Sequence, residues 1–220
     1  MIKAIIFDLD TSIIDFLTFK VESAKSAANE MVRQGLNCSD LTLYGKIFSI
    51  YEKEGLDYQK TFHDVLLSFN LSPDDFERIQ QSAIGAYLKR KFETLKPFPF
   101  VKTTLFRLPL NIKKIGISLS PRNKVWQRLV ITSLENDFSP VFSKDTSPNL
   151  PDLINLSLGQ FGIHSSEALF VSSDEKKLTA AKNLSLKTCF TKYGSLRKPQ
   201  NTWDYSIDSF DQLTSIIRFS

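Results

Sequence analysis

The hydrophobic pattern divides the chain into three stretches of different character. Residues 2–7 form a short apolar run without alternation, which is typical of a central parallel strand covered on both faces. From about residue 16 to residue 93, apolar positions recur at helical spacing in four successive stripes, which predicts four consecutive helices. Beyond residue 96, strand-like and helix-like segments alternate to the end of the chain.

The alternation in the last stretch predicts a parallel sheet, because strands that alternate with helices favour right-handed crossovers. We therefore predict an α/β fold with a Rossmann-like, doubly wound parallel sheet built from residues 1–15 and 94–220. A four-helix-bundle cap is expected to be inserted at residues 16–93. The expected later strands are 114–118, 141–142, 168–172, 187–191 and a last one at Ile207, and the expected helices are 123–132, 150–161, 174–184 and 209–217.

Composition narrows the class of protein. The chain has 220 residues, of which 42% are hydrophobic, enough for one core domain with a smaller inserted domain. Its two cysteines, Cys38 and Cys189, fit neither a disulfide framework nor a zinc site, so a reducing, cytoplasmic setting is expected. The opening apolar run is too short for a signal peptide or a membrane span, and no nucleic-acid module is present. We expect neither a membrane nor a nucleic acid as partner.

Two aspartates follow the first predicted strand. Asp8 and Asp10 lie two residues apart where the strand ends. In open α/β sheets, ligands bind outside the carboxyl ends of the strands. An aspartate carboxylate can also act as a covalent nucleophile toward phosphorus. The pair is therefore the first candidate site.

The segment Phe7–Asp15, with the sequence FDLDTSIID, resembles the first motif of the haloacid dehalogenase superfamily in its phosphatase branch, usually Asp-x-Asp-Gly-Thr-Leu-x-Asp. The resemblance covers the whole chain, including the inserted cap, and looks closest to archaeal and bacterial small-metabolite phosphatases. It implies that Asp8 is the nucleophile, that Asp10 is the general acid and base, and that both ligate Mg²⁺. Thr11 stands where the family has Gly, and a β-branched residue disfavours unusual φ/ψ values. We therefore expect an altered loop.

The resemblance also implies two phosphate-binding residues. Ser118, at the end of the next core strand, matches the hydroxyl of the second motif, although Pro121 follows where small residues are usual. The lysine of the third motif is absent, because Ser147 and Pro148 stand at its position. Lys144, three residues upstream, either replaces it in substrate binding or is an ordinary surface lysine.

The fourth motif departs furthest from the family pattern. Ser173 occupies the position of a metal-ligating aspartate, and Lys177 occupies the position of a second acid. Asp174 either supplies the missing metal ligand, which would give the set Asp8, Asp10 and Asp174, or caps the helix that follows. Removal of a carboxylate, the placing of Lys177 nearby and the loss of the motif lysine all weaken the reaction, because Mg²⁺ and that lysine normally neutralise the phosphate charge. Two losses of about 3 kcal/mol each would slow the reaction roughly 10⁴-fold.

Three functions remain open on this basis. The first is a phosphatase of weakened or lost Mg²⁺-dependent activity, acting on a small phosphorylated metabolite. The second is a catalytically inactive binding or scaffold protein with a protein partner, for which the basic clusters Lys89–Lys91 and Arg197–Lys198 are candidate surfaces, unless they are simply solvated. The third is a metal-independent hydrolase, because Val171-Ser172-Ser173 also resembles the equivalent segment of 2-haloacid dehalogenases, which need no magnesium.

Overall fold

The computed structural model describes residues 1–195 and 199–218. It divides into two compact units, one formed by Met1–Asp15 with Lys96–Ser220 and the other by Phe16–Leu95. The basic pair Arg197–Lys198 lies outside the described residues. None of the described helices combines the length and the apolar composition that a membrane crossing requires.

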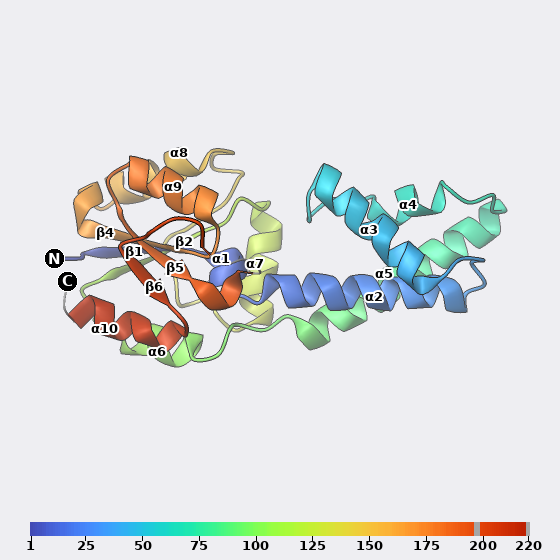
Figure 1. The fold of residues 1–220 in the computed structure, drawn as a ribbon, viewed down its shortest axis with the longest axis horizontal. Helices are drawn as coiled ribbons and strands as arrows, with labels where there is room; N and C mark the ends of the chain where they lie inside the picture. Colours follow the sequence, from blue (N-terminus) through green and yellow to red (C-terminus); the bar gives the residue numbers. More distant parts are fainter. Residues whose placement is uncertain (196–198, 219–220) are drawn as a thin grey trace. The chain divides into compact units, whose positions relative to one another are not determined.

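The first unit contains a six-stranded sheet in which every strand pair is parallel, and this confirms the predicted α/β fold. The strand order is β3-β2-β1-β4-β5-β6, with the first strand at the centre. Helices α8 and α9 cover one face of the sheet, and α6 and α10 lie on the other (Figure 1). The strands are β1 (Ala4–Asp8), β2 (Lys113–Ile117), β3 (Val141–Phe142), β4 (Ala168–Ser172), β5 (Lys187–Thr191) and β6 (Tyr205–Ile207). The helices are α1 (Leu9–Ser12), α6 (Val101–Arg107), α7 (Arg122–Ile131), α8 (Leu150–Gly159), α9 (Glu175–Asn183) and α10 (Leu213–Arg218).

Burial of β1 on both faces explains its sequence. All five of its residues are buried, and Ile6 packs in one core cluster with Ile115 of β2 and Phe170 of β4. Gly116 of β2 leaves room for Leu9, whose Cδ1 would lie only 3.1 Å from a Cβ at that position. The centre of the sheet therefore holds the start of the Leu9–Ser12 turn close to the ends of β1 and β2.

The second unit consists of four helices, α2 (Phe16–Arg33), α3 (Asp40–Glu54), α4 (Thr61–Leu66) and α5 (Pro73–Thr94). Their apolar stripes meet in one core cluster that includes Ala24, Ala28, Met31, Ile47, Val65, Ile79 and Ala83. Residues at the start of helix α5 cap it, because the Ser72 hydroxyl accepts a hydrogen bond from the Asp75 N–H, and Pro73 follows directly at the first helical position.

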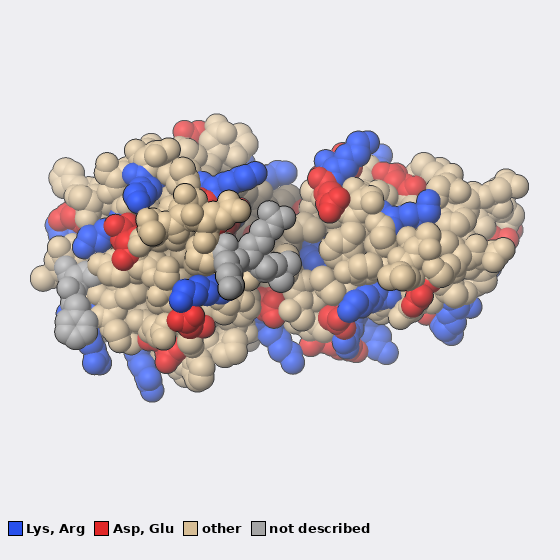
Figure 2. Space-filling model, viewed as in Figure 1, with Lys and Arg blue, Asp and Glu red and all other residues tan. Residues whose placement is uncertain are grey.

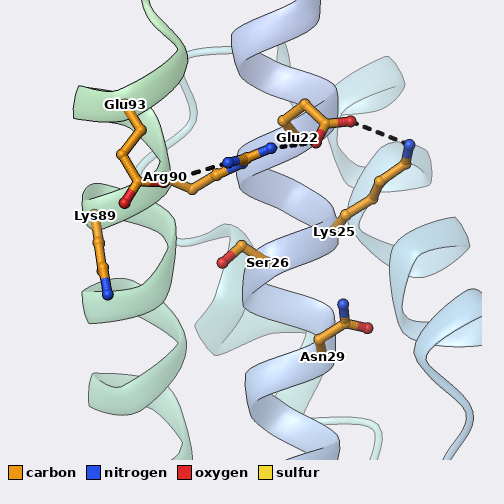
Figure 3. A pocket seen from close by; sticks show the side chains of 7 residues that line it. All are labelled: Glu22, Lys25, Ser26, Asn29, Lys89, Arg90 and Glu93. Carbon is orange, nitrogen blue, oxygen red and sulfur yellow. Dashed lines mark hydrogen bonds and ion pairs between the residues drawn. The ribbon is translucent and has the colours of Figure 1, made fainter.

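A surface groove of about 460 Å³ runs between α2 and α5 (Figure 3). Arg90 reaches from α5 to Glu22 on α2 at 2.9 Å and also contacts Glu93, while Lys25 pairs with Glu22. Acidic and basic side chains are likewise interspersed on the face seen in Figure 2. Within the Lys89–Lys91 cluster, the solvated interpretation is wrong for Lys91, which is only 6% exposed and has its ammonium 5.7 Å from the centre of the Phe19 ring.

Candidate active site

The site begins where β1 ends, at a carboxylate that is almost entirely buried. Asp8 is 1% exposed, and the turn that follows it brings Asp10 back toward the same edge of the sheet. Within this turn Asp10 is extended and Thr11 adopts a φ of 63°. The expectation of an altered loop assumes that Thr11 avoids such a conformation, but the residue takes the left-handed conformation that glycine would adopt more easily.

Asp8 forms an ion pair with Lys177, the third residue of α9. The Lys177 Nζ lies 2.8 Å from Oδ1 and 3.0 Å from Oδ2 of Asp8, and the Ser172 hydroxyl donates to Oδ2 at 2.8 Å. Burial raises the pKa of Asp8, and Lys177 opposes this effect. Burial disfavours the Lys177 charge, but attraction and hydrogen bonding to Asp8 prevail and raise the pKa of Lys177. Contact of one ammonium with both oxygens favours the charged pair.

Asp10 forms a second ion pair, with Arg128 of α7. The Arg128 guanidinium, only 3% exposed, donates to Asp10 Oδ1 at 2.8 Å and to the Ser120 hydroxyl at 2.9 Å. The Ser118 hydroxyl donates to Asp10 Oδ2 at 2.6 Å. Ser118 thus lies beside the aspartate pair, as its position at the end of β2 predicts, but its hydroxyl proton is directed to Asp10.

A third contact closes the turn against the loop after β4. The hydroxyl oxygens of Thr11 and Ser173 lie 2.5 Å apart, and the Ser173 N–H donates to the Ser12 hydroxyl at 3.0 Å. Gly194 fits against this turn only because it lacks a side chain, since a Cβ there would lie 1.7 Å from the Thr11 carbonyl oxygen. The Ser173 hydroxyl, at the position where the family pattern has a metal ligand, is therefore engaged by Thr11.

The structure does not bring the side chains of the other two predicted residues into contact with Asp8 or Asp10. Asp174 is the N-cap of α9, and its Oδ1 accepts hydrogen bonds from the backbone N–H of Lys176 at 2.8 Å and of Lys177 at 3.4 Å. Lys144 has an exposed side chain on the loop after β3, where its backbone N–H donates to the Ser120 carbonyl. The metal role of Asp174 and the substrate role of Lys144 stay predictions.

The residues at this site do not fit a magnesium ion. All four carboxylate oxygens of Asp8 and Asp10 already accept hydrogen bonds from Lys177, Arg128 and serine hydroxyls. Among residues 1–195 and 199–218, no cluster of three or more His, Cys, Asp or Glu is arranged to hold a metal. Two like unit charges 4 Å apart repel by about 4 kcal/mol at an effective dielectric near 20, and a divalent ion beside Lys177 would double that penalty. Magnesium also demands near-octahedral oxygen coordination.

Sequence reasoning missed Arg128 as a site residue and expected Lys177 only to weaken the site. The signal for Arg128 is its place in the buried stripe of α7, between Val125 and Leu129, where a lone charged residue needs a buried partner. Lys177 likewise directly precedes the buried Leu178 in α9. The sequence pattern alone does not indicate which carboxylate pairs with Arg128 and which with Lys177.

An aspartate pair at the end of the central strand, with Asp8 buried and Asp10 partly exposed, beside a serine at the end of the next strand, is typical of aspartate-based hydrolases on a Rossmann-like sheet. A family model for haloacid dehalogenase-like hydrolases matches residues 5–191. The chain belongs to this family.

Individual relatives agree with this assignment. The chain is 25% identical over 226 residues to the glyceraldehyde 3-phosphate phosphatase of Pyrococcus furiosus, which covers 98% of this chain and 93% of that protein. Among solved structures, a β-phosphoglucomutase-like protein from Thermotoga maritima superposes with a TM-score of 0.76 at 18% identity, covering 99% of each chain. The L-2-haloacid dehalogenase from Xanthobacter autotrophicus superposes with a TM-score of 0.62 at 18% identity, covering 100% of this chain and 99% of that one. The two structures support the fold alone.

Proposed function

We propose that this protein descends from small-metabolite phosphatases and that its Mg²⁺-dependent phosphoryl transfer is reduced to a very low rate or lost. The observation that carries the proposal is the contact of Lys177 Nζ with both oxygens of Asp8, at 2.8 and 3.0 Å. The site keeps the carboxylate of the predicted nucleophile, but a protein side chain covers the oxygens that would attack phosphorus.

The chemistry of phosphoryl transfer explains why this contact matters. The nucleophile must approach phosphorus in line with the leaving group, and cations must neutralise the phosphoryl oxygens. Here the negative charge of Asp8 is paired with Lys177, and Asp10 accepts hydrogen bonds from Arg128 and Ser118. Lys177, Arg128 and Ser118, three donors that could bind a phosphate, are thus directed to carboxylates of the protein itself. Loss of two contributions of about 3 kcal/mol each lowers a rate roughly 10⁴-fold.

The substrate class for any residual activity is a small phosphorylated metabolite, since the relatives at about 25% identity are named glyceraldehyde 3-phosphate phosphatases. The two cysteines of the chain are free, in keeping with the cytoplasmic setting that belongs to this proposal. A chain without turnover would act as a binding module, and its partner would then be a protein.

The test is hydrolysis of p-nitrophenyl phosphate and of glyceraldehyde 3-phosphate, with and without MgCl₂. We expect the wild-type protein and the Asp8→Asn variant to release phosphate at the same background rate. Asp208→Asn, at an aspartate that is 68% exposed, controls for the loss of one negative charge. A Mg²⁺-dependent turnover of about 1 s⁻¹ or more that Asp8→Asn abolishes would refute the proposal.

One observation favours a second candidate, a metal-independent hydrolase of the 2-haloacid dehalogenase type. The Lys177 ammonium orients Asp8 without a metal, and Ser172 supplies a hydrogen bond to the same carboxylate. A carboxylate held in this way resembles a nucleophile for attack on carbon rather than on phosphorus. Halide release from L-2-chloropropionate in the presence of EDTA, lost on Asp8→Asn, would support this candidate; no release under these conditions eliminates it.

A further inference from the structure

We infer that the Lys177 ammonium is a tethered cation that takes the place of a divalent ion, so that the aspartate site is complete without metal. The inference rests on the proposed function and deepens it, because it assigns the loss of metal dependence to two positions, 173 and 177. It also predicts that replacing both by aspartate gives the protein a divalent-cation site.

The charges around the aspartate pair balance without any ion. Asp8 and Asp10 carry two negative charges, and Lys177 and Arg128 carry two positive charges in direct contact with them. The Lys177 side chain is 20% exposed and the Asp8 side chain 2%, so this neutralisation takes place where water screens little. An added divalent ion would leave the cluster with two excess positive charges.

The position of Lys177 is fixed by the start of α9. The Asp174 cap binds the backbone N–H groups of Lys176 and Lys177, and it thereby fixes the first turn of the helix. The Ser172 hydroxyl joins the two parts, because it accepts from the Asp174 N–H at 3.0 Å and donates to Asp8. The ammonium is therefore a built component of the site and not a mobile surface charge.

Position 173 is the second position to which the loss of metal dependence is assigned. The Ser173 hydroxyl, 2.5 Å from the Thr11 hydroxyl, lies on the loop that joins β4 to α9, directly after Ser172, whose hydroxyl donates to Asp8. The double variant Ser173→Asp/Lys177→Asp removes the cation and adds two carboxylates to Asp8 and Asp10. Such a cluster is rich in the oxygen ligands that Mg²⁺ prefers, and waters can complete the coordination.

The experiment measures thermal unfolding with MgCl₂, against tetramethylammonium chloride at equal ionic strength. We expect the melting temperature of the wild-type protein to change by less than about 1 °C. For the double variant we expect a rise of roughly 3–6 °C at a tenfold excess of Mg²⁺ over its Kd, and a binding isotherm by calorimetry. Lys176→Asp, one residue away and exposed, is the matched control and should behave as wild type.

A second variant keeps the inference testable if the double variant does not fold. Lys177→Ala leaves Asp8 without its cation, and ethylammonium can reach the vacated space and donate hydrogen bonds to the carboxylate. We expect ethylammonium to restore at least half of the lost melting temperature, whereas tetramethylammonium, which has no N–H, restores none. Absence of rescue would overturn the inference.

Three further outcomes separate the inference from the proposed function. Saturable binding of Mg²⁺ to the wild-type protein, lost on Asp8→Asn, would overturn the inference whether or not phosphate is released. A folded double variant that binds no Mg²⁺ would overturn it as well. By contrast, Asp8-dependent phosphate release by the wild-type protein in EDTA would contradict the equal background rates that the proposed function expects and would leave the tethered cation in place.

Discussion

Substitution of Lys177 by Met tests how strongly Asp8 depends on its partner. The change keeps most of the side-chain volume and removes the charge, so that among the described residues Asp8, 1% exposed, retains only the Ser172 side-chain hydrogen bond. Removing one partner of a buried ion pair typically costs about 3–5 kcal/mol, because a buried charge is left uncompensated. For a domain of 150–250 residues, this corresponds to a fall in melting temperature of roughly 6–20 °C.

The loss of stability in Lys177→Met should depend on pH, and the direction of this dependence follows from the pKa of Asp8. Burial already raises the pKa of Asp8 against the opposing effect of Lys177, so removal of the lysine raises it further. A group with a raised folded-state pKa destabilises the folded state as pH rises through the window above its unfolded value near 3.9. The variant should therefore approach wild-type stability near pH 4 and show its full loss at pH 7–8.

Chemical denaturation followed by tryptophan fluorescence is the suitable assay. The two tryptophans, Trp126 and Trp203, both belong to the unit that contains the ion pair, so the signal reports the unfolding of that unit. Lys176→Met should change the free energy of unfolding by less than about 0.5 kcal/mol. The double variant Asp8→Asn/Lys177→Met should recover most of the loss. A cost below about 1 kcal/mol that does not vary with pH would refute the reasoning.

Two other substitutions probe the same network. Arg128→Met should lower the free energy of unfolding by about 2–4 kcal/mol, somewhat less than Lys177→Met, because Asp10 is 14% exposed and keeps Ser118 as a donor. A loss below about 0.5 kcal/mol, measured by urea denaturation, would contradict the pairing of Arg128 with Asp10. Gly194→Ala should cost more than about 2 kcal/mol, since its Cβ would overlap the Thr11 carbonyl, whereas Gly45→Ala, in α3 with open space around it, should stabilise by about 0.5–1 kcal/mol. Equal melting temperatures for these two glycine variants would contradict the close approach.

The sheet could be predicted from the sequence because its strands are buried on both faces. Strands β4 and β5 lie at residues 168–172 and 187–191, as their apolar runs predict. The long helices could be predicted equally well from the helical spacing of their apolar residues. The third helix of the inserted unit was harder to bound, because α4 ends at Leu66 and turns carry the chain on to Phe69. An apolar stripe shows which residues face the core but not whether the backbone remains helical between them.

The pairing of charges could not be predicted in the same way. Lys91 continues the inner stripe of α5 four residues after Tyr87 and eight after Ala83, yet its residue type suggests solvent. Its ammonium lies over the Phe19 ring, and the long apolar part of a lysine can be buried in this way. The partners of Arg128 and Lys177 are equally hard to predict, because they lie far away along the chain. Their partners come from the far end of the chain, and only the assembled sheet brings them together.

The place of β1 at the centre of the sheet bears on the order in which the protein can assemble during translation. Ala4 pairs with Lys113 on one side and with Ala168 on the other, so β1, which is synthesised before the other five strands of the sheet, remains unpaired until its neighbours have been made. The helices of Phe16–Leu95 emerge in between and can form their contacts locally, which is the faster process. Until β2 and β4 arrive, an apolar strand with two open edges is exposed to aggregation and to chaperones.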